Sequence, residues 1–222
     1  MRKIEKIILY SKEYEKWLND LEVQDRNHPD YDKYRKYYND VKLELSRCQR
    51  GLCAYTEMKL CGTETFSIDK WENGRCKIKT KIEAFGTLDH FDPTLKKEKG
   101  WLWANFFVVS GHINKSVKRD KSVDYILKPD TDDYDPFDKM MFNARLNMFI
   151  PNPKKTPDEQ ERIKEMIDML GINYEPVRSI RSDFIKRLRK AIEYEAYDPT
   201  DYQNSEFPTT LSFILEEAET QN

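Results

Sequence analysis

Three runs of residues within one short stretch decide the expected fold: Gly-Thr-Leu-Asp-His-Phe-Asp-Pro at 86–93, Trp-Ala-Asn-Phe-Phe at 103–107, and Ser-Gly-His-Ile-Asn-Lys-Ser-Val-Lys-Arg at 110–119. They bring five possible donor side chains close together in the sequence: Asp89, His90, Asn105, His112 and Asn114. Hydrolysis of a phosphodiester needs a base that activates water and a cation that takes up charge on the phosphate. The stretch therefore predicts a phosphodiester-cleaving site with one metal ion.

The residue types suggest how the work is divided. His90 can act as the base, because an imidazole titrates near neutral pH. A hard divalent ion, Mg²⁺ or Mn²⁺, prefers oxygen ligands and keeps several waters. Asp89 with Asn114 or His112 meets that need, and the choice between Asn114 and His112 stays open at this point.

The flanking residues predict a compact α+β core. Residues 76–84 alternate small or apolar residues with charged ones, which is typical of a strand with one wet face. Residues 101–109 form a second apolar run and are predicted to be a strand. Residues 114–119 are predicted to be a short helix, with Asn114 near its start as a favoured cap. We expect a strand, a loop, a strand and a helix to surround one ion.

These motifs make the chain similar to the HNH nuclease family. Within it, the chain resembles the HNH subunits found beside an ATPase in Septu-type and retron-linked antiphage systems. Cys-Ala-Tyr-Thr-Glu at 53–57 resembles the opening motif of that group. The segment 161–181, which contains Met-Leu-Gly-Ile-Asn, resembles its C-terminal helical extension.

The resemblance implies a ββα-metal fold with helical extensions at both ends and a metal-dependent endonuclease that cuts DNA. It makes His90 the general base, Asp89 and Asn114 metal ligands, and Asn105 the residue that holds the loop of the base. His112 has no fixed role in the family and is expected to be a second ligand or a phosphate contact. An ATPase partner subunit is implied by the resemblance alone.

The chain departs from the family at the structural zinc site. Two Cys-x-x-Cys pairs hold this zinc in many HNH proteins, but the matching positions here read Cys53 and Thr56, then Ser110 and Ile113. A tetrahedral zinc site needs four good ligands, so no zinc knuckle is expected. A metal site built from Cys53, Cys61, Cys76 and one histidine stays open as an alternative to small buried thiols.

Charge alone does not mark a nucleic-acid binder, because the formal net charge of the chain is -2. The distribution matters more, since affinity for phosphates depends on the Lys and Arg residues that reach the backbone. Lys115, Lys118 and Arg119 beside the expected site are predicted to contact nucleic acid. An ordinary solvated face is the alternative for these basic residues.

The remainder of the 222 residues is predicted to be a helical frame. Apolar periodicity, a capping box at Thr156 and a helix stop at Gly171 give helices at 11–24, 31–50, 157–170, 176–195 and 207–218. The acidic run from 130 to 138 is predicted to be a connector. The expected organisation is a helical segment at 1–50, a nuclease core at 51–127 and a helical extension at 128–222.

No membrane span or signal peptide is recognised, so a cytoplasmic protein with reduced cysteines and no membrane partner is expected. The function expected is DNA hydrolysis as the effector of an ATPase-coupled antiphage system. Two alternatives stay open. The chain could cut RNA, such as tRNA, by the same chemistry, or it could be a non-catalytic assembly or DNA-binding subunit with a decayed site.

Overall fold

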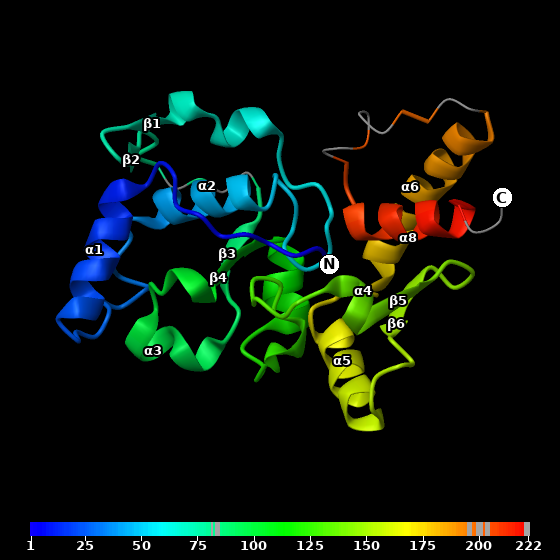
Figure 1. Ribbon diagram of the computed structural model, residues 1–222. Helices are drawn as coiled ribbons and strands as arrows, with labels where there is room; N and C mark the ends of the chain where they lie inside the picture. Colours follow the sequence, from blue (N-terminus) through cyan, green and yellow to red (C-terminus); the bar gives the residue numbers. More distant parts are fainter. Residues whose placement is uncertain (81, 83–84, 195–196, 199–201, 203–204, 220–222) are drawn as a thin grey trace. The chain divides into compact units, whose positions relative to one another are not determined.

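The computed structural model describes residues 1–80, 82, 85–194, 197–198, 202 and 205–219, and the chain divides into two compact units (Figure 1). We call Ile4–Cys53 with Leu60–Val123 the aromatic unit, because all four tryptophans lie in it. Met1–Lys3, Ala54–Lys59 and Asp124–Asn222 form the helical unit. The fold is mixed α+β, with small antiparallel two-stranded sheets.

The aromatic unit contains helices, two short strand pairs and a π-helix. Its elements are α1 (Lys12–Val23), α2 (Tyr38–Cys48), β1 (Trp71–Glu72), β2 (Arg75–Cys76), β3 (Thr87–His90), α3 (Lys96–Lys99), β4 (Phe106–Val109) and the π-helix Ile113–Lys118. The helical unit consists of α4 (Pro136–Lys139), β5 (Met140–Asn143), β6 (Met148–Pro151), α5 (Pro157–Met169), α6 (Glu175–Glu193) and α8 (Pro208–Glu219). None of the described helices has the length and apolar composition needed to cross a bilayer.

The predicted helix at 11–24 is confirmed as α1, which buries Tyr14, Leu18 and Leu21 on one face. Tyr14 and Leu18 pack in a hydrophobic cluster that includes the aromatic rings of Trp101 and Phe106. The helix predicted at 31–50 begins only at Tyr38. The reason for the late start is local, because the Asp30 carboxylate accepts the backbone N–H of Asp32 at 2.8 Å and holds the chain in a turn.

The strand predicted at 76–84 is wrong over the residues that the structure describes, since β2 ends at Cys76 and the chain is irregular at 77–80. Positions 81, 83 and 84 lie outside the described residues. The backbone of this segment pairs with side chains of α2 instead of a neighbouring strand. Asn39 Nδ2 donates to the carbonyls of Ile78 and Thr80 at 2.8 and 2.9 Å, and Lys42 Nζ donates to the carbonyls of Ile82 and Gly86 at 2.5 and 2.9 Å.

Asp89 and His90 lie inside β3, whereas a strand that ended at residue 84 would have left both beyond its end. The apolar run at 101–109 supplies the partner strand β4, but only from Phe106 onward. The residues before it form a short 3-10 turn at Trp103–Asn105. The helix expected at 114–119 is present as the π-helix Ile113–Lys118.

In the helical unit, the predicted capping box at Thr156 is confirmed, with reciprocal contacts between Thr156 and Glu159 at the start of α5. The helices expected at 176–195 and 207–218 are present as α6 and α8. The β5–β6 hairpin was not predicted. Its turn depends on a contact distant in sequence, because Arg181, which is 1% exposed, donates from Nε to Asn147 Oδ1 at 2.9 Å.

The outer edge of β4 is closed by a single buried side chain, Gln49, at the end of α2. Its Nε2 donates to the carbonyls of Leu52 and Val108 at 2.8 and 2.7 Å, and its Oε1 accepts the N–H of Val108 at 2.9 Å. The amide thereby replaces a third strand at this position of the sheet. It connects α2 to the strand pair that carries Asp89 and His90.

We expect Gln49→Leu to destabilise the aromatic unit by about 2–4 kcal/mol, because it leaves a buried N–H and two buried carbonyls without a partner. Urea unfolding followed by tryptophan fluorescence measures this unit, since all four tryptophans lie in it. The control is Gln24→Leu at an exposed position, which should change the free energy of unfolding by less than about 0.5 kcal/mol. Equal effects of the two substitutions would show that the Gln49 amide does not hold β4.

Candidate active site

The strand pair β3–β4 positions the two central side chains of the expected site. In the antiparallel register, Asp89 lies opposite Phe107 and His90 opposite Phe106. Asp89 is 4% exposed and His90 is 8% exposed. Because neighbouring residues of a strand point to opposite faces, the two side chains leave the ladder on different sides. The π-helix lies over the side that Asp89 faces, as the contact of Lys118 with Asp89 shows.

The imidazole of His90 is held in one orientation. Its Nε2 lies 2.9 Å from the carbonyl oxygen of Gly100. Since a carbonyl only accepts, Nε2 carries the hydrogen and Nδ1 keeps its lone pair. The ring contacts Tyr31 edge-on, with centroids 4.5 Å apart, and Phe106 at 4.6 Å.

These aromatic rings also set the charge of His90. Burial removes water from the imidazolium and lowers the pKa of His90 to about 4, although the hydrogen bond to Gly100 works in the opposite direction. At neutral pH the ring is therefore uncharged, with Nδ1 as a proton acceptor. This is the protonation state that a general base must have before reaction.

Asn105 fixes the chain that follows His90. Its Oδ1 accepts the N–H of Asp92 at 2.8 Å, and its Nδ2 donates to the carbonyl of Asp92, also at 2.8 Å. Its own carbonyl accepts the N–H of Phe91 at 2.8 Å. The Asn105 side chain thus binds both the N–H and the carbonyl of Asp92, two residues after His90. Asn105 is only 2% exposed. The side chain does not touch the imidazole, so Asn105 is a positioning residue.

The π-helix binds β3 through two side chains. Asn114 Nδ2 donates to Thr87 Oγ1 and to the carbonyl of Leu88, each at 3.1 Å. Lys118 Nζ donates to the carbonyl of His90 at 2.8 Å and lies 3.2 Å from Asp89 Oδ2. Residues four apart lie on one face of a helix, which explains why both side chains reach the same strand.

Lys118 therefore differs from its predicted role as a nucleic-acid contact. Its side chain is fully buried and forms an ion pair with Asp89, whose side chain is 5% exposed. Lys115 and Arg119, the other two predicted contacts, are exposed on either side of it. Arg119 ends the helix with φ at 55°, and its N–H donates to the carbonyl of Asn114 at 2.9 Å.

The donor set fits a divalent ion only in part. Asp89 offers the hard carboxylate that Mg²⁺ or Mn²⁺ prefers, and Asn114 offers an amide oxygen. The ammonium of Lys118 lies at that carboxylate, so a divalent ion at Asp89 has to compete with this positive charge. His112 is exposed just before the π-helix. Over the part of the chain that the structure describes, no three His, Cys, Asp or Glu side chains gather in a way that could hold a metal.

Two of the positions that were compared with the zinc-binding cysteine pairs, Cys53 and Ser110, are joined by a hydrogen bond. The backbone N–H of Ser110 donates to Cys53 Sγ at 3.4 Å. All four cysteines are present as free thiols. Burial raises the pKa of the Cys48 and Cys76 thiols, which disfavours the thiolate form that a metal ligand needs.

Sequence reasoning missed Tyr31, the Gly100 carbonyl and the pairing of Lys118 with Asp89. Tyr31, which packs on His90, is distant in sequence and gives no local signal. The carbonyl of Gly100 that fixes the imidazole is a backbone group, so no residue type reveals it. Lys118 did have a signal, because it lies four residues after Asn114, a spacing that puts two side chains on one helical face.

Comparison of the sequence with protein-family models and with curated proteins gives no match.

We expect His90 to titrate near pH 4, well below an ordinary imidazole, and NMR of the ring resonances measures this directly. The chain has only three histidines, so loss of one signal in His90→Gln assigns it. Unfolded His90 binds its proton near its ordinary pKa, so the stability of the native state falls as the pH drops from about 6.5 towards 4. A midpoint near 6.5 for His90 would contradict the desolvated site.

Proposed function

We propose that the chain is an HNH-type ββα-metal endonuclease that hydrolyses phosphodiester bonds, with DNA as the substrate. The observation that carries the proposal is the arrangement around His90. A neutral imidazole has its Nε2–H bound to Gly100, and the segment after it is bound at both polar groups by Asn105. An Asp precedes the His on the same strand, and a helix carrying Asn114 packs on that strand.

The chain's own groups supply the proton transfer. His90 Nδ1 accepts a proton from the attacking water, and the positive charge that forms on the ring is stabilised through Nε2–H by the Gly100 carbonyl. The hydroxide adds to phosphorus, and the bond from phosphorus to the leaving oxygen breaks; the leaving oxygen keeps the electron pair of that bond and takes up a proton from solvent. Asn105 keeps His90 in place during this step without contacting the reacting atoms.

A divalent ion, Mg²⁺ or Mn²⁺, would be held by the Asp89 carboxylate and the Asn114 amide oxygen, with His112 as a further candidate ligand. When bound, it supplies positive charge to the scissile phosphate and the leaving oxygen. The ion would have to compete with the Lys118 ammonium for Asp89. The exposed cations Lys115 and Arg119 stand beside the site and support contact with a phosphate backbone.

The wider role proposed is that of the effector in an ATPase-coupled antiphage system, with the ATPase as a separate subunit. This part depends on the resemblance of the motifs at 53–57, 86–119 and 161–181 to that group of HNH subunits. RNA, such as tRNA, remains the alternative substrate, because this chemistry does not depend on the sugar.

One observation favours a second candidate, a non-catalytic assembly or DNA-binding subunit with an HNH-like fold. The buried ion pair between Lys118 and Asp89 already satisfies the carboxylate that a metal would need. A protein that no longer binds the ion is stabilised by such a pair relative to an unpaired buried Asp. The two candidates differ in whether metal can displace the ammonium.

The nuclease proposal is tested with His90→Gln, incubating the protein with double-stranded DNA, single-stranded DNA and tRNA in Mg²⁺ or Mn²⁺. Gln retains an Nε2 donor for Gly100 but has no basic nitrogen, so cleavage should fall by about 10²–10⁴-fold while the fold is kept. Circular dichroism and tryptophan fluorescence check the fold. Cleavage at the parental rate in His90→Gln would exclude His90 as the base.

Lys118→Met decides between the two candidates. It removes the ammonium that pairs with the buried Asp89 carboxylate, which should destabilise the aromatic unit by about 3–5 kcal/mol without metal. If the site binds metal, Mn²⁺ should restore stability in thermal unfolding, and calorimetry should show tighter binding than in the parent. The matched control, Lys118→Met with Asp89→Asn, removes both charges and should not respond to Mn²⁺. Identical Mn²⁺ responses in all three proteins would support the non-catalytic candidate.

A further inference from the structure

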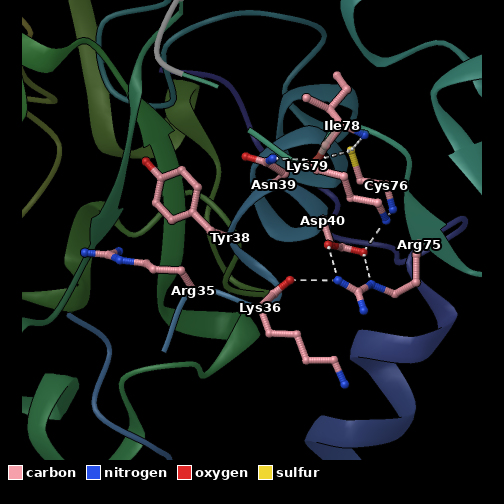
Figure 2. Close-up of a pocket in the computed structure, with 9 residues that line it drawn as sticks. All are labelled: Arg35, Lys36, Tyr38, Asn39, Asp40, Arg75, Cys76, Ile78 and Lys79. Atoms are coloured by element: carbon pink, nitrogen blue, oxygen red, sulfur yellow. Dashed lines mark hydrogen bonds and ion pairs between the residues drawn. The ribbon is translucent and has the colours of Figure 1, made fainter. Parts of the chain in front are cut away.

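A second candidate binding site lies in the aromatic unit, away from the residues discussed so far. A cavity of about 140 Å³ opens at the start of α2, between α2 and the segment around β2. Its lining includes the basic residues Arg35, Lys36, Arg75 and Lys79 and one acidic residue, Asp40. Figure 2 shows Arg35 and Tyr38 on one side of this cavity, with Asp40 and Arg75 on the other. In a chain whose net charge is -2, such a local excess of cations points to an anionic ligand.

Asp40, the acidic residue of this lining, binds neighbouring groups of the cavity wall. Asp40 is 1% exposed, and its Oδ1 accepts Arg75 Nε at 2.9 Å and the backbone N–H of Cys76 at 3.1 Å. Arg75 Nη2 also donates to the carbonyl of Lys36 at 2.7 Å. These contacts, drawn as dashed lines in Figure 2, fix the guanidinium of Arg75 in the wall. The contacts involve Nε and Nη2 of Arg75. The negative charge of Asp40 compensates one of the four positive charges that line the cavity.

Arg35 is fixed by aromatic rings. Its guanidinium lies 5.4 Å from the ring centre of Tyr38, which lines the cavity, and 4.5 Å from the ring centre of Tyr31. Its partner carboxylate, Asp32 at 3.5 Å, has a side chain that is 64% exposed, so solvent screens this pair. A planar guanidinium held in this way presents a fork of donors that matches the oxygens of a phosphate.

The same aromatic rings connect the cavity to the candidate active site. Tyr31 contacts the imidazole of His90, and the guanidinium of Arg35, a residue that lines the cavity, lies over the ring of the same Tyr31. One aromatic side chain and one guanidinium therefore separate His90 from the cavity. A strand of nucleic acid that presents one phosphate to His90 has further phosphates along its backbone at regular spacing.

We propose that this cavity is a phosphate subsite, which binds a backbone phosphate of the nucleic acid near the bond presented to His90. The proposal depends on the proposed nuclease function for the identity of the ligand, whereas the charge and shape of the cavity are independent of it. The cavity gives the overall acidic chain a defined place to hold a polyanion. It adds residues of α2 and the β2 segment to the exposed cations beside the π-helix.

The test measures binding without cleavage. The parent for this test is His90→Gln, and the pocket variant adds Arg35→Gln and Lys79→Gln while leaving the Asp40–Arg75 pair intact. Fluorescence anisotropy with a labelled single-stranded and a labelled double-stranded oligonucleotide gives the affinities at several salt concentrations. We expect at least about fivefold weaker binding by the pocket variant, and a salt slope smaller by about one.

A matched control separates the cavity from net charge. Arg145→Gln with Lys164→Gln makes the same change in charge at exposed positions of the helical unit. This control should keep its oligonucleotide affinity within about twofold of the parent. Equal weakening in the control and the pocket variant would overturn the proposal.

A second measurement distinguishes a backbone phosphate from a free anion. Calorimetry with inorganic phosphate is carried out on the parent and the pocket variant. Saturable phosphate binding that is lost in the pocket variant, with oligonucleotide affinity unchanged, would assign the cavity to a free anion and overturn the proposal. Oligonucleotide binding that depends on the cavity would support it even if the native chain cleaves neither DNA nor RNA, in which case only the nuclease assignment fails.

Discussion

The ion pair between Lys118 and Asp89 is the interaction on which the rest of the site depends. Lys118 extends from the π-helix to β3, where its ammonium binds both the carboxylate of Asp89 and the carbonyl of His90. Breaking a buried pair leaves a charge without compensation, which costs several kcal/mol. The pair therefore holds the helix against the strand, and it engages the carboxylate that the proposed metal ion would bind.

The second constraint is the aromatic packing around His90. Tyr31 and Phe106 exclude water from the imidazole, and Gly100 fixes its tautomer. The ring is consequently neutral and directed, but also a weak base, with a pKa of about 4. The segment that contributes Tyr31 lies between α1 and α2, so the N-terminal helical region is part of the site's construction and belongs to the same compact unit as the strands.

Sequence reasoning worked best where a residue acts through its immediate neighbours. The capping box at Thr156 and the face of α1 were predicted correctly, because both depend on spacing within one helix. The strand expected at 76–84 failed for the opposite reason. Its alternating pattern is real, but Asn39 and Lys42 of α2 satisfy the backbone that a neighbouring strand would otherwise bind. A pattern of side chains does not show which groups will satisfy the backbone.

The sequence by itself indicated that Asp89, His90, Asn105 and Asn114 would lie near one strand pair, because an Asp-His pair, an Asn and a second Asn at short intervals can be brought together by two strands and a helix. Only the tertiary structure decided the protonation state of His90, the pairing of Lys118 with Asp89 and the cationic cavity beside α2. Each of these depends on desolvation or on contacts between segments far apart in the chain. Such effects arise when residues distant in the sequence exclude water from an ionisable side chain, and the spacing of residues along the chain does not reveal them.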